Sequence, residues 1–239
     1  RERAQLARAN QHPNAALDDL RRAVALSPDD PWLRFELASL LGEQQQPDAA
    51  EATLRELLAR PPASADAHFA MALFQARQQQ DLPALLQLEH IPTSARTPGM
   101  TALQQRLWLR ETLRRASDDL ARQQGASAYT RTQAASQALG GRAEHAAALA
   151  EGWRQLGEPA HALAEFDRLP DTPATRLARA QQLLNLSQLA EAHAQWASVP
   201  APSDELRDTW RSLARQLAEA QARAEPNTEL ARAHWQIGR

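Results

Sequence analysis

The chain has 239 residues, a net charge of −2, and a composition that is 43% hydrophobic but only 5% aromatic. Helix-favouring Ala, Leu, Gln, Arg and Glu dominate while Val and Ile are scarce, so the composition predicts an all-α protein. Interspersed charges of both signs argue against a basic face that binds nucleic acid. The absence of cysteine excludes a disulfide framework, a thiolate zinc site and a cysteine nucleophile.

Two segments near the N-terminus end in proline and repeat the same pattern. Pro28 closes the first and Pro62 the second, and their spacing, 62 − 28 = 34, defines the repeat period. Small and large apolar residues recur with the same period on one face of a helix. They are Ala16, Leu20 and Ala23 in the first segment and Ala50, Leu54 and Leu57 in the second.

Shorter segments of the same kind follow at 83–92, 159–170 and 189–200. Each begins its apolar face with alanine and ends in proline, which cannot continue a helix. The alanines are Ala84, Ala162 and Ala192, and the prolines are Pro92, Pro170 and Pro200.

A partner helix is predicted before each of the last four closing segments, at 31–44, 65–79, 143–156 and 175–186. Each partner carries a small residue where it must approach the closing helix closely. These residues are Ala38, Ala72, Ala150 and Ala180. A further helix is expected at 203–224, ended by Pro226, and another from 228 to 237.

Residues 97–142 interrupt the period. One helix is predicted from Met100 to Gln123, ended by Gly125, and a second from Ser127 to Leu139, ended by Gly140 and Gly141. We interpret this region as an inserted helical hinge between two repeat blocks, and a divergent repeat is the alternative.

The period, the alanines and the prolines resemble the tetratricopeptide repeat (TPR) family over about 1–92 and 143–200. The resemblance implies an all-α TPR-type helix-turn-helix solenoid with a non-TPR helical insertion. The expected divisions are an N-terminal block at 1–92, the insertion at 93–142 and a C-terminal block at 143–239. Because the first helix starts part-way at Arg1 and neither end has a polar cap, we expect a fragment of a longer array.

No catalytic constellation is visible in the sequence. It lacks a Gly-rich phosphate loop and a Ser nucleophile elbow, so we expect no enzyme activity and no cofactor. His161 and Glu165 have a helical i, i+4 spacing, but such pairs are common on solvated surfaces, and no metal site is predicted.

The first helices of TPR units line the groove of the family, which places specific residues there. The candidates are Trp32, Phe35, Ser39, Asp66, Phe69 and Leu73. Aromatic residues on an open face favour protein contacts or stacking on sugar rings, whereas packing between neighbouring helices is the structural alternative. The Lys and Asn residues with which some TPR domains clamp a terminal carboxylate are absent from these positions.

The Ala-, Gln- and Arg-rich repeats of variable length, some ending in Leu-Pro as at Leu169–Pro170, resemble the periplasmic TPR region of the bacterial cellulose synthase complex or of a related exopolysaccharide exporter. That resemblance implies a periplasmic scaffold linking the synthase to an outer-membrane pore, whose barrel would lie beyond residue 239. Partners would be proteins of the secretion complex, with polysaccharide or peptidoglycan as further ligands, and no nucleic acid or membrane insertion within this segment. The alternative is a cytoplasmic adaptor or assembly chaperone that binds a peptide or helix in its groove.

Overall fold

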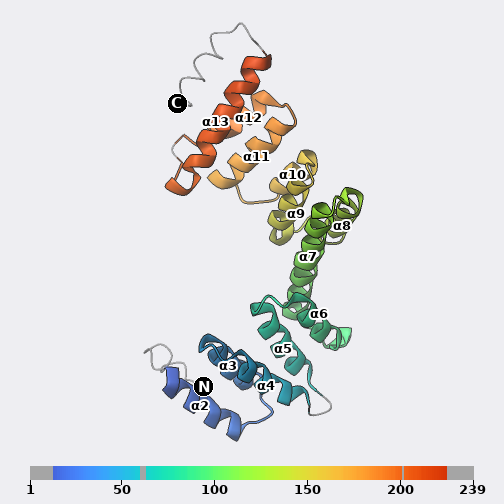
Figure 1. The fold of residues 1–239 in the computed structure, drawn as a ribbon, viewed down its shortest axis with the longest axis vertical. Coiled ribbons are helices and arrows are strands. Elements are labelled where there is room, and N and C mark those ends of the chain that lie inside the picture. The colour runs from blue at the N-terminus through green and yellow to red at the C-terminus, as the bar shows by residue number, and fades with distance from the viewer. Residues whose placement is uncertain (1–12, 60–62, 201, 225–239) are drawn as a thin grey trace. The chain divides into compact units, whose positions relative to one another are not determined.

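The computed structural model describes residues 13–59, 63–200 and 202–224, and in this part of the chain every regular element is a helix (Figure 1). The predicted all-α helix-turn-helix architecture is confirmed. The chain divides into two compact units, with the boundary between Glu111 and Thr112. The three-part division into 1–92, 93–142 and 143–239 stays a prediction.

The helices of the first unit alternate between an opening and a closing member of each pair. They are α2 (Pro13–Leu26), α3 (Pro31–Glu43), α4 (Pro47–Leu58), α5 (Ala65–Arg77) and α6 (Asp81–Glu89), followed by the short 3₁₀ turn η1 (Thr93–Ala95) and the beginning of α7 (Pro98–Ala121). The second unit contains the rest of α7, then α8 (Gly125–Leu139), α9 (Ala143–Gln155), α10 (Pro159–Phe166), α11 (Pro173–Asn185), α12 (Leu189–Ala197) and α13 (Asp204–Ala224).

Local sequence fixes where the opening helices begin. The Asp30 carboxylate accepts from the backbone N–H groups of Trp32 and Leu33 at 2.9 and 3.1 Å, and Pro31 follows at the first helical position. Ser64 and Thr172 cap α5 and α11 in the same way. These caps satisfy N–H groups that have no partner within the helix.

The turn between the two helices of a pair repeats along the chain. Each contains one residue in the left-handed region, with φ between 60° and 72°. These residues are Gln45, Gln79, Gln123, Gly157 and Ser187. The backbone N–H that follows bonds back to a carbonyl one helical turn earlier, as in Gln46 N to Leu41 O at 3.0 Å and Gln80 N to Gln75 O at 2.9 Å. This pattern is the Schellman C-terminal motif, and it turns the chain into the closing helix.

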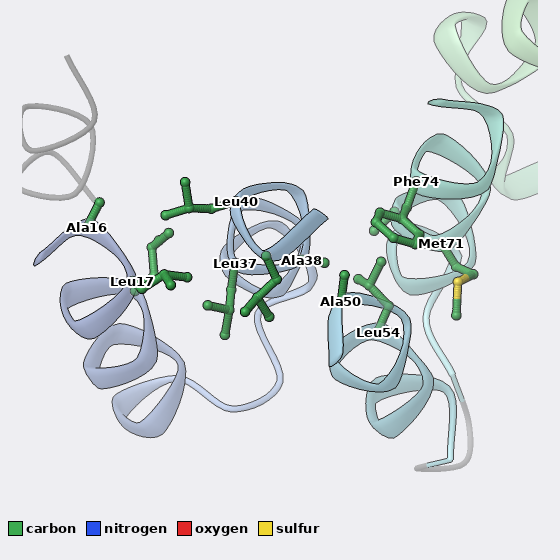
Figure 2. Packing of buried hydrophobic residues seen from close by; sticks show 12 residues of the cluster. Ala16, Leu17, Leu37, Ala38, Leu40, Ala50, Leu54, Met71 and Phe74 are labelled. Atoms are coloured by element: carbon green, nitrogen blue, oxygen red, sulfur yellow. The ribbon is translucent and has the colours of Figure 1, made fainter. Parts of the chain in front are cut away.

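Alanines occupy the points of closest helix approach. All nine repeat alanines are completely buried: Ala16, Ala50, Ala84, Ala162 and Ala192 on closing helices, and Ala38, Ala72, Ala150 and Ala180 on opening ones. Figure 2 shows Ala38 of α3 and Ala50 of α4 among the leucines of the first core cluster, with Met71 and Phe74 of α5 beside them. Because alanine fills little volume, the backbones of paired helices can approach closely.

Proline follows the closing helices at Pro28, Pro92, Pro170 and Pro200, while Pro62 lies outside the described residues. The prediction that the later closing helices are shorter is confirmed: α6, α10 and α12 have 9, 8 and 9 residues, against 14 in α2 and 12 in α4.

Residues 97–142 combine an extension with a repeat-like hairpin. Helix α7 has 24 residues, whereas α3, α5, α9 and α11 each have 13. Its last part and α8 bury Ala116 and Ala128, which lie one repeat period before Ala150 and Ala162. For 109–142 this spacing favours the divergent repeat, which the sequence left open as the alternative to an inserted hinge, and the segment without a counterpart is 98–108.

Gly125 begins α8 and does not end the preceding helix, which is a correction to the sequence prediction. The left-handed residue that reverses the chain is Gln123, whose φ is 62°. Glutamine was not recognised as a turn residue because glycine is the usual occupant. The second helix does end at Gly140, as predicted.

The predicted partial helix at Arg1, Pro226 and the helix expected at 228–237 lie outside the described residues. Among the helices that the structure describes, none is both long and apolar enough to cross a membrane.

Candidate functional site

The six predicted groove residues lie on the opening helices α3 and α5, which pack against each other. Asp66 is exposed and the other five are half-buried. The half-buried residues are Trp32, Phe35, Ser39, Phe69 and Leu73. Phe35 contacts the first core cluster, whereas Phe69 and Leu73 contact the neighbouring cluster around Ala72 and Leu88. The aromatic side chains therefore contribute to packing and still present part of their surface to solvent.

Three of these residues form one aromatic cluster across the two helices. The Trp32 ring meets Phe35 edge-on at 6.1 Å between centroids and meets Phe69 edge-on at 5.9 Å. Edge-to-face contacts of this kind stabilise an arrangement beyond the area that they bury. The cluster therefore lies on the face that α3 and α5 share, in the N-terminal halves of both helices.

Arg77, at the end of α5, extends this face toward the C-terminal ends of both helices. Its guanidinium lies over the Phe35 ring, 4.7 Å from the centroid, and its Nη1 donates to Ser39 Oγ at 3.1 Å. A cation above an aromatic ring is attracted by the ring's negative face. Arg77 is thus oriented from two sides while its side chain remains exposed.

A pocket of about 230 Å³ lies beside Arg77, between the C-terminal ends of α3 and α5. Its lining residues are Ser39, Gly42 and Glu43 from α3, and Phe74, Arg77 and Gln78 from α5 and its cap. It combines a buried aromatic ring with a hydroxyl, a carboxylate, a guanidinium and an amide. Of the predicted groove residues, Ser39 is the one that contributes to this lining.

The sequence prediction missed Gly42, Glu43, Phe74, Arg77 and Gln78. It followed the groove face only as far as Ser39 and Leu73 and stopped one helical turn short of the helix ends. The repeat itself carried a signal, because Glu43 and Arg77 are one repeat period apart and so occupy equivalent positions on α3 and α5.

A second, larger pocket lies in the second unit, between α11 and α13. It has a volume of about 540 Å³ and is lined by Leu184, Ser187, Leu189, Gln216, Glu219, Ala220, Arg223 and Ala224. At its edge Gln181 Nε2 donates to Gln216 Oε1 at 3.0 Å. Leu184 follows Ala180 at the same spacing as Gly42 follows Ala38, so both pockets occupy the same position in the repeat.

No site for a metal ion is evident among the described residues. These residues contain no group of three or more His, Asp or Glu side chains able to hold a metal. His161 stacks on Trp153 at 4.4 Å, whereas Glu165 is buried, accepts from Ser136 Oγ at 3.1 Å and pairs with Arg168. The two side chains of the His161 and Glu165 pair therefore lie in different environments, His161 exposed and Glu165 buried.

The comparisons with known proteins agree with this fold. Residues 7–76 match the family model described as tetratricopeptide repeat. No curated protein matches the chain.

Solved structures of TPR proteins are similar over most of the chain. The C-terminal part of a TPR repeat-containing protein from Cytophaga hutchinsonii is 11% identical, with 98% of each chain covered and a TM-score of 0.58. A TPR protein from Parabacteroides merdae is 14% identical over 99% of this chain and 96% of its own, with a TM-score of 0.49. A TPR protein from Thermus thermophilus is 25% identical over 77% of this chain and 98% of its own, with a TM-score of 0.39. Because so few residues are identical, the similarity to the Cytophaga structure establishes the fold alone.

Proposed function

We propose that this chain, whose fold is a TPR-type solenoid, is a non-catalytic scaffold that binds other proteins through the faces of its opening helices. We further propose that it is the periplasmic part of a bacterial cellulose or exopolysaccharide secretion system, where it links the synthase to the outer-membrane pore.

The face formed by α3 and α5 carries the scaffold proposal. Trp32, Phe35 and Phe69 form a cluster that is half-buried, and Arg77 is oriented above Phe35 at its edge. Aromatic residues and arginine are the side chains that most often dominate binding energy at protein interfaces. Because they are already held by contacts within the chain, little conformational entropy is lost when a partner binds.

The form of the repeats supports the secretion proposal. The closing helices α6, α10 and α12 have only 8 or 9 residues, and α10 is followed by Leu169 and Pro170. Short, alanine-rich repeats of unequal length resemble those of the cellulose secretion scaffold. This resemblance lies in the style of the sequence over the whole chain and rests on no single motif.

The proposal is tested in the source bacterium with the full-length protein. Deletion of the coding region should abolish secretion of the polymer, and re-expression should restore it. A photo-crosslinking amino acid at the exposed Asp66 should then link the protein to a component of the synthase or of the outer-membrane exporter. The same amino acid at the exposed Ser127 of α8 is the control position.

Unchanged polymer secretion together with a cytoplasmic crosslinked partner would favour the alternative, a general adaptor. One observation supports that alternative: Arg77 and Ser39 present a guanidinium and a hydroxyl at the mouth of a small pocket. Such a pair suits an acidic or polar side chain of a bound peptide.

A further inference from the structure

The pocket at the C-terminal ends of α3 and α5 is small, polar and partly aromatic, and it differs in these respects from an apolar groove for a helix. We propose that it binds one neutral pyranose ring of a polysaccharide chain. This inference rests on the proposed function, in which the protein accompanies an exported polymer. It assigns that polymer a contact site on the first unit.

The polar lining matches the chemistry of sugar hydroxyls. A hydroxyl both donates and accepts hydrogen bonds, so its recognition requires donors and acceptors side by side. Arg77 supplies N–H donors, the Glu43 carboxylate supplies acceptors, and the Gln78 amide supplies both. The lining contains one negative group, Glu43, and one positive group, Arg77, whose charges offset each other, which matches a neutral ring.

The apolar lining matches the other part of a sugar ring. Phe74 is buried and lines the pocket. The Phe35 ring packs against the Arg77 guanidinium, with 4.7 Å between the guanidinium carbon and the ring centroid. A pyranose with equatorial hydroxyls presents flat C–H faces that pack on apolar and aromatic surface. Its hydroxyls project sideways from those faces, where the polar groups of the lining stand.

The size of the pocket limits the ligand to one ring. Its volume of about 230 Å³ is below the range of about 300–1,000 Å³ that is usual for drug-sized ligands. Neighbouring sugars of a longer chain would remain outside, so the site would bind weakly and would allow a polymer to move past.

Gly42 leaves the floor of the pocket open. A Cβ atom at this position would lie 3.6 Å from Gln78 Nε2 and 3.9 Å from Phe74 Cε2, which are ordinary van der Waals distances. Alanine is therefore accommodated by the fold, but its methyl group enters the space proposed for the sugar. The equivalent residue on α5, one repeat period later, is already alanine, Ala76.

The experiment is an NMR titration of the whole chain with cellotetraose, which represents a secreted glucan, and with chitotetraose, which represents an amino-sugar polymer. The variants are Gly42→Ala, which fills the pocket, and Arg77→Met, which removes the donors but keeps an unbranched apolar side chain. Gly125→Ala is the matched control, because no atom lies within 4 Å of the added Cβ. Thermal unfolding verifies that all variants fold.

We expect saturable binding of one of the two neutral oligosaccharides by the wild-type chain and by Gly125→Ala. The dissociation constant should increase about tenfold, equivalent to about 1.4 kcal/mol, in Gly42→Ala and in Arg77→Met. The sugar that binds identifies the source of the polymer. The proposal is overturned if neither sugar binds, or if folded Gly42→Ala binds as the wild type does. Those results leave the secretion test untouched, because that test measures polymer export and protein crosslinks.

Discussion

Arg34 of α3 donates from Nη1 to the backbone carbonyl of Thr53 in α4 at 2.8 Å, and so ties the opening helix to the closing helix of its own pair. Its Nε donates to the carbonyl of Pro28 at 2.7 Å, and Nη1 also pairs with Glu56 at 2.9 Å. The side chain is buried although it carries a charge. It thereby supplies a donor to the Pro28 carbonyl in the turn before α3, and a second donor to the Thr53 carbonyl inside α4.

The same position has a related role in two other repeats. Arg176, which precedes Ala180 at the same spacing as Arg34 precedes Ala38, donates to the Ser198 carbonyl at the end of α12 at 3.2 Å. In α5 the position holds His68, whose Nδ1 lies 3.0 Å from Gln87 Oε1. Gln87 lies one repeat period after Thr53, so the contact between the opening and the closing helix involves equivalent positions in both repeats.

Replacing Arg34 with Met should destabilise the chain. Methionine keeps most of the apolar volume but removes the Arg34 donor from the Pro28 carbonyl and the second donor from the Thr53 carbonyl, at a cost of about 1–3 kcal/mol. Urea denaturation measures the change, with Arg22→Met on the exposed face of α2 as the control. If both variants unfold at the same urea concentration, the buried arginine contributes no net stability and the expected role of its hydrogen bonds is refuted.

Such examples show what the sequence could predict and what it could not. Alanine spacing and proline positions predicted the helix pairs because they report close packing and helix ends, which are local requirements. The role of Arg34 depends on the position of Thr53 on the next helix, which no local sequence pattern predicts. The divergent repeat at 109–142 was predicted only as the alternative to an insertion for a different reason: Thr132 occupies a core position where the other repeats hold a larger apolar residue, such as Leu54.

The residues named from the sequence include only part of the candidate site. Trp32, Phe35 and Phe69 were placed on the groove face by the resemblance to the TPR family, and Ser39, placed there in the same way, lines the pocket. The pocket, however, lies where α3 and α5 end, and its shape depends on the turn that brings Gln78 beside Gly42. Periodicity along one helix contains no information about that neighbour.

Leucine at Ala50 or at Ala162 should force apart a pair of helices. Both alanines are completely buried, so the larger side chain has no space without movement of the backbone. Overpacking of this kind costs about 1–3 kcal/mol. Thermal unfolding tests the prediction against Ala52→Leu and Ala164→Leu, which place the same side chain at exposed positions of α4 and α10. Equal melting temperatures within each matched pair would contradict it.

Glycine at Gln79 should stabilise the chain. The residue has φ 60°, a conformation in which a non-glycine residue is strained by about 1–2 kcal/mol. Glycine removes the strain but adds freedom to the unfolded chain, so we expect a net gain of about 0.5–1 kcal/mol. The control is Gln137→Gly at an exposed position inside α8, where glycine should cost about 1 kcal/mol. A loss of stability in both variants would contradict the assignment of backbone strain to Gln79.

Asp171 should make the stability of the second unit sensitive to acid. Hydrogen bonds from Arg176, at 2.6 and 2.9 Å, hold the pKa of this carboxyl below its ordinary value of 3.8, and the nearby charge of Arg179 acts in the same direction. Because the pKa is lower in the folded chain than in the unfolded one, the carboxylate contributes stability above the unfolded value and loses that contribution as the pH falls through the folded value. Asp171→Asn should therefore lower the melting temperature at neutral pH, and its melting temperature should fall less than that of the wild type between neutral pH and about pH 3.

Asp208→Asn, at an exposed position of α13, is the control and should follow the wild-type curve. Parallel curves of melting temperature against pH for wild type and Asp171→Asn would contradict the prediction. They would show that this ion pair contributes no measurable stability, as is the case for many exposed pairs.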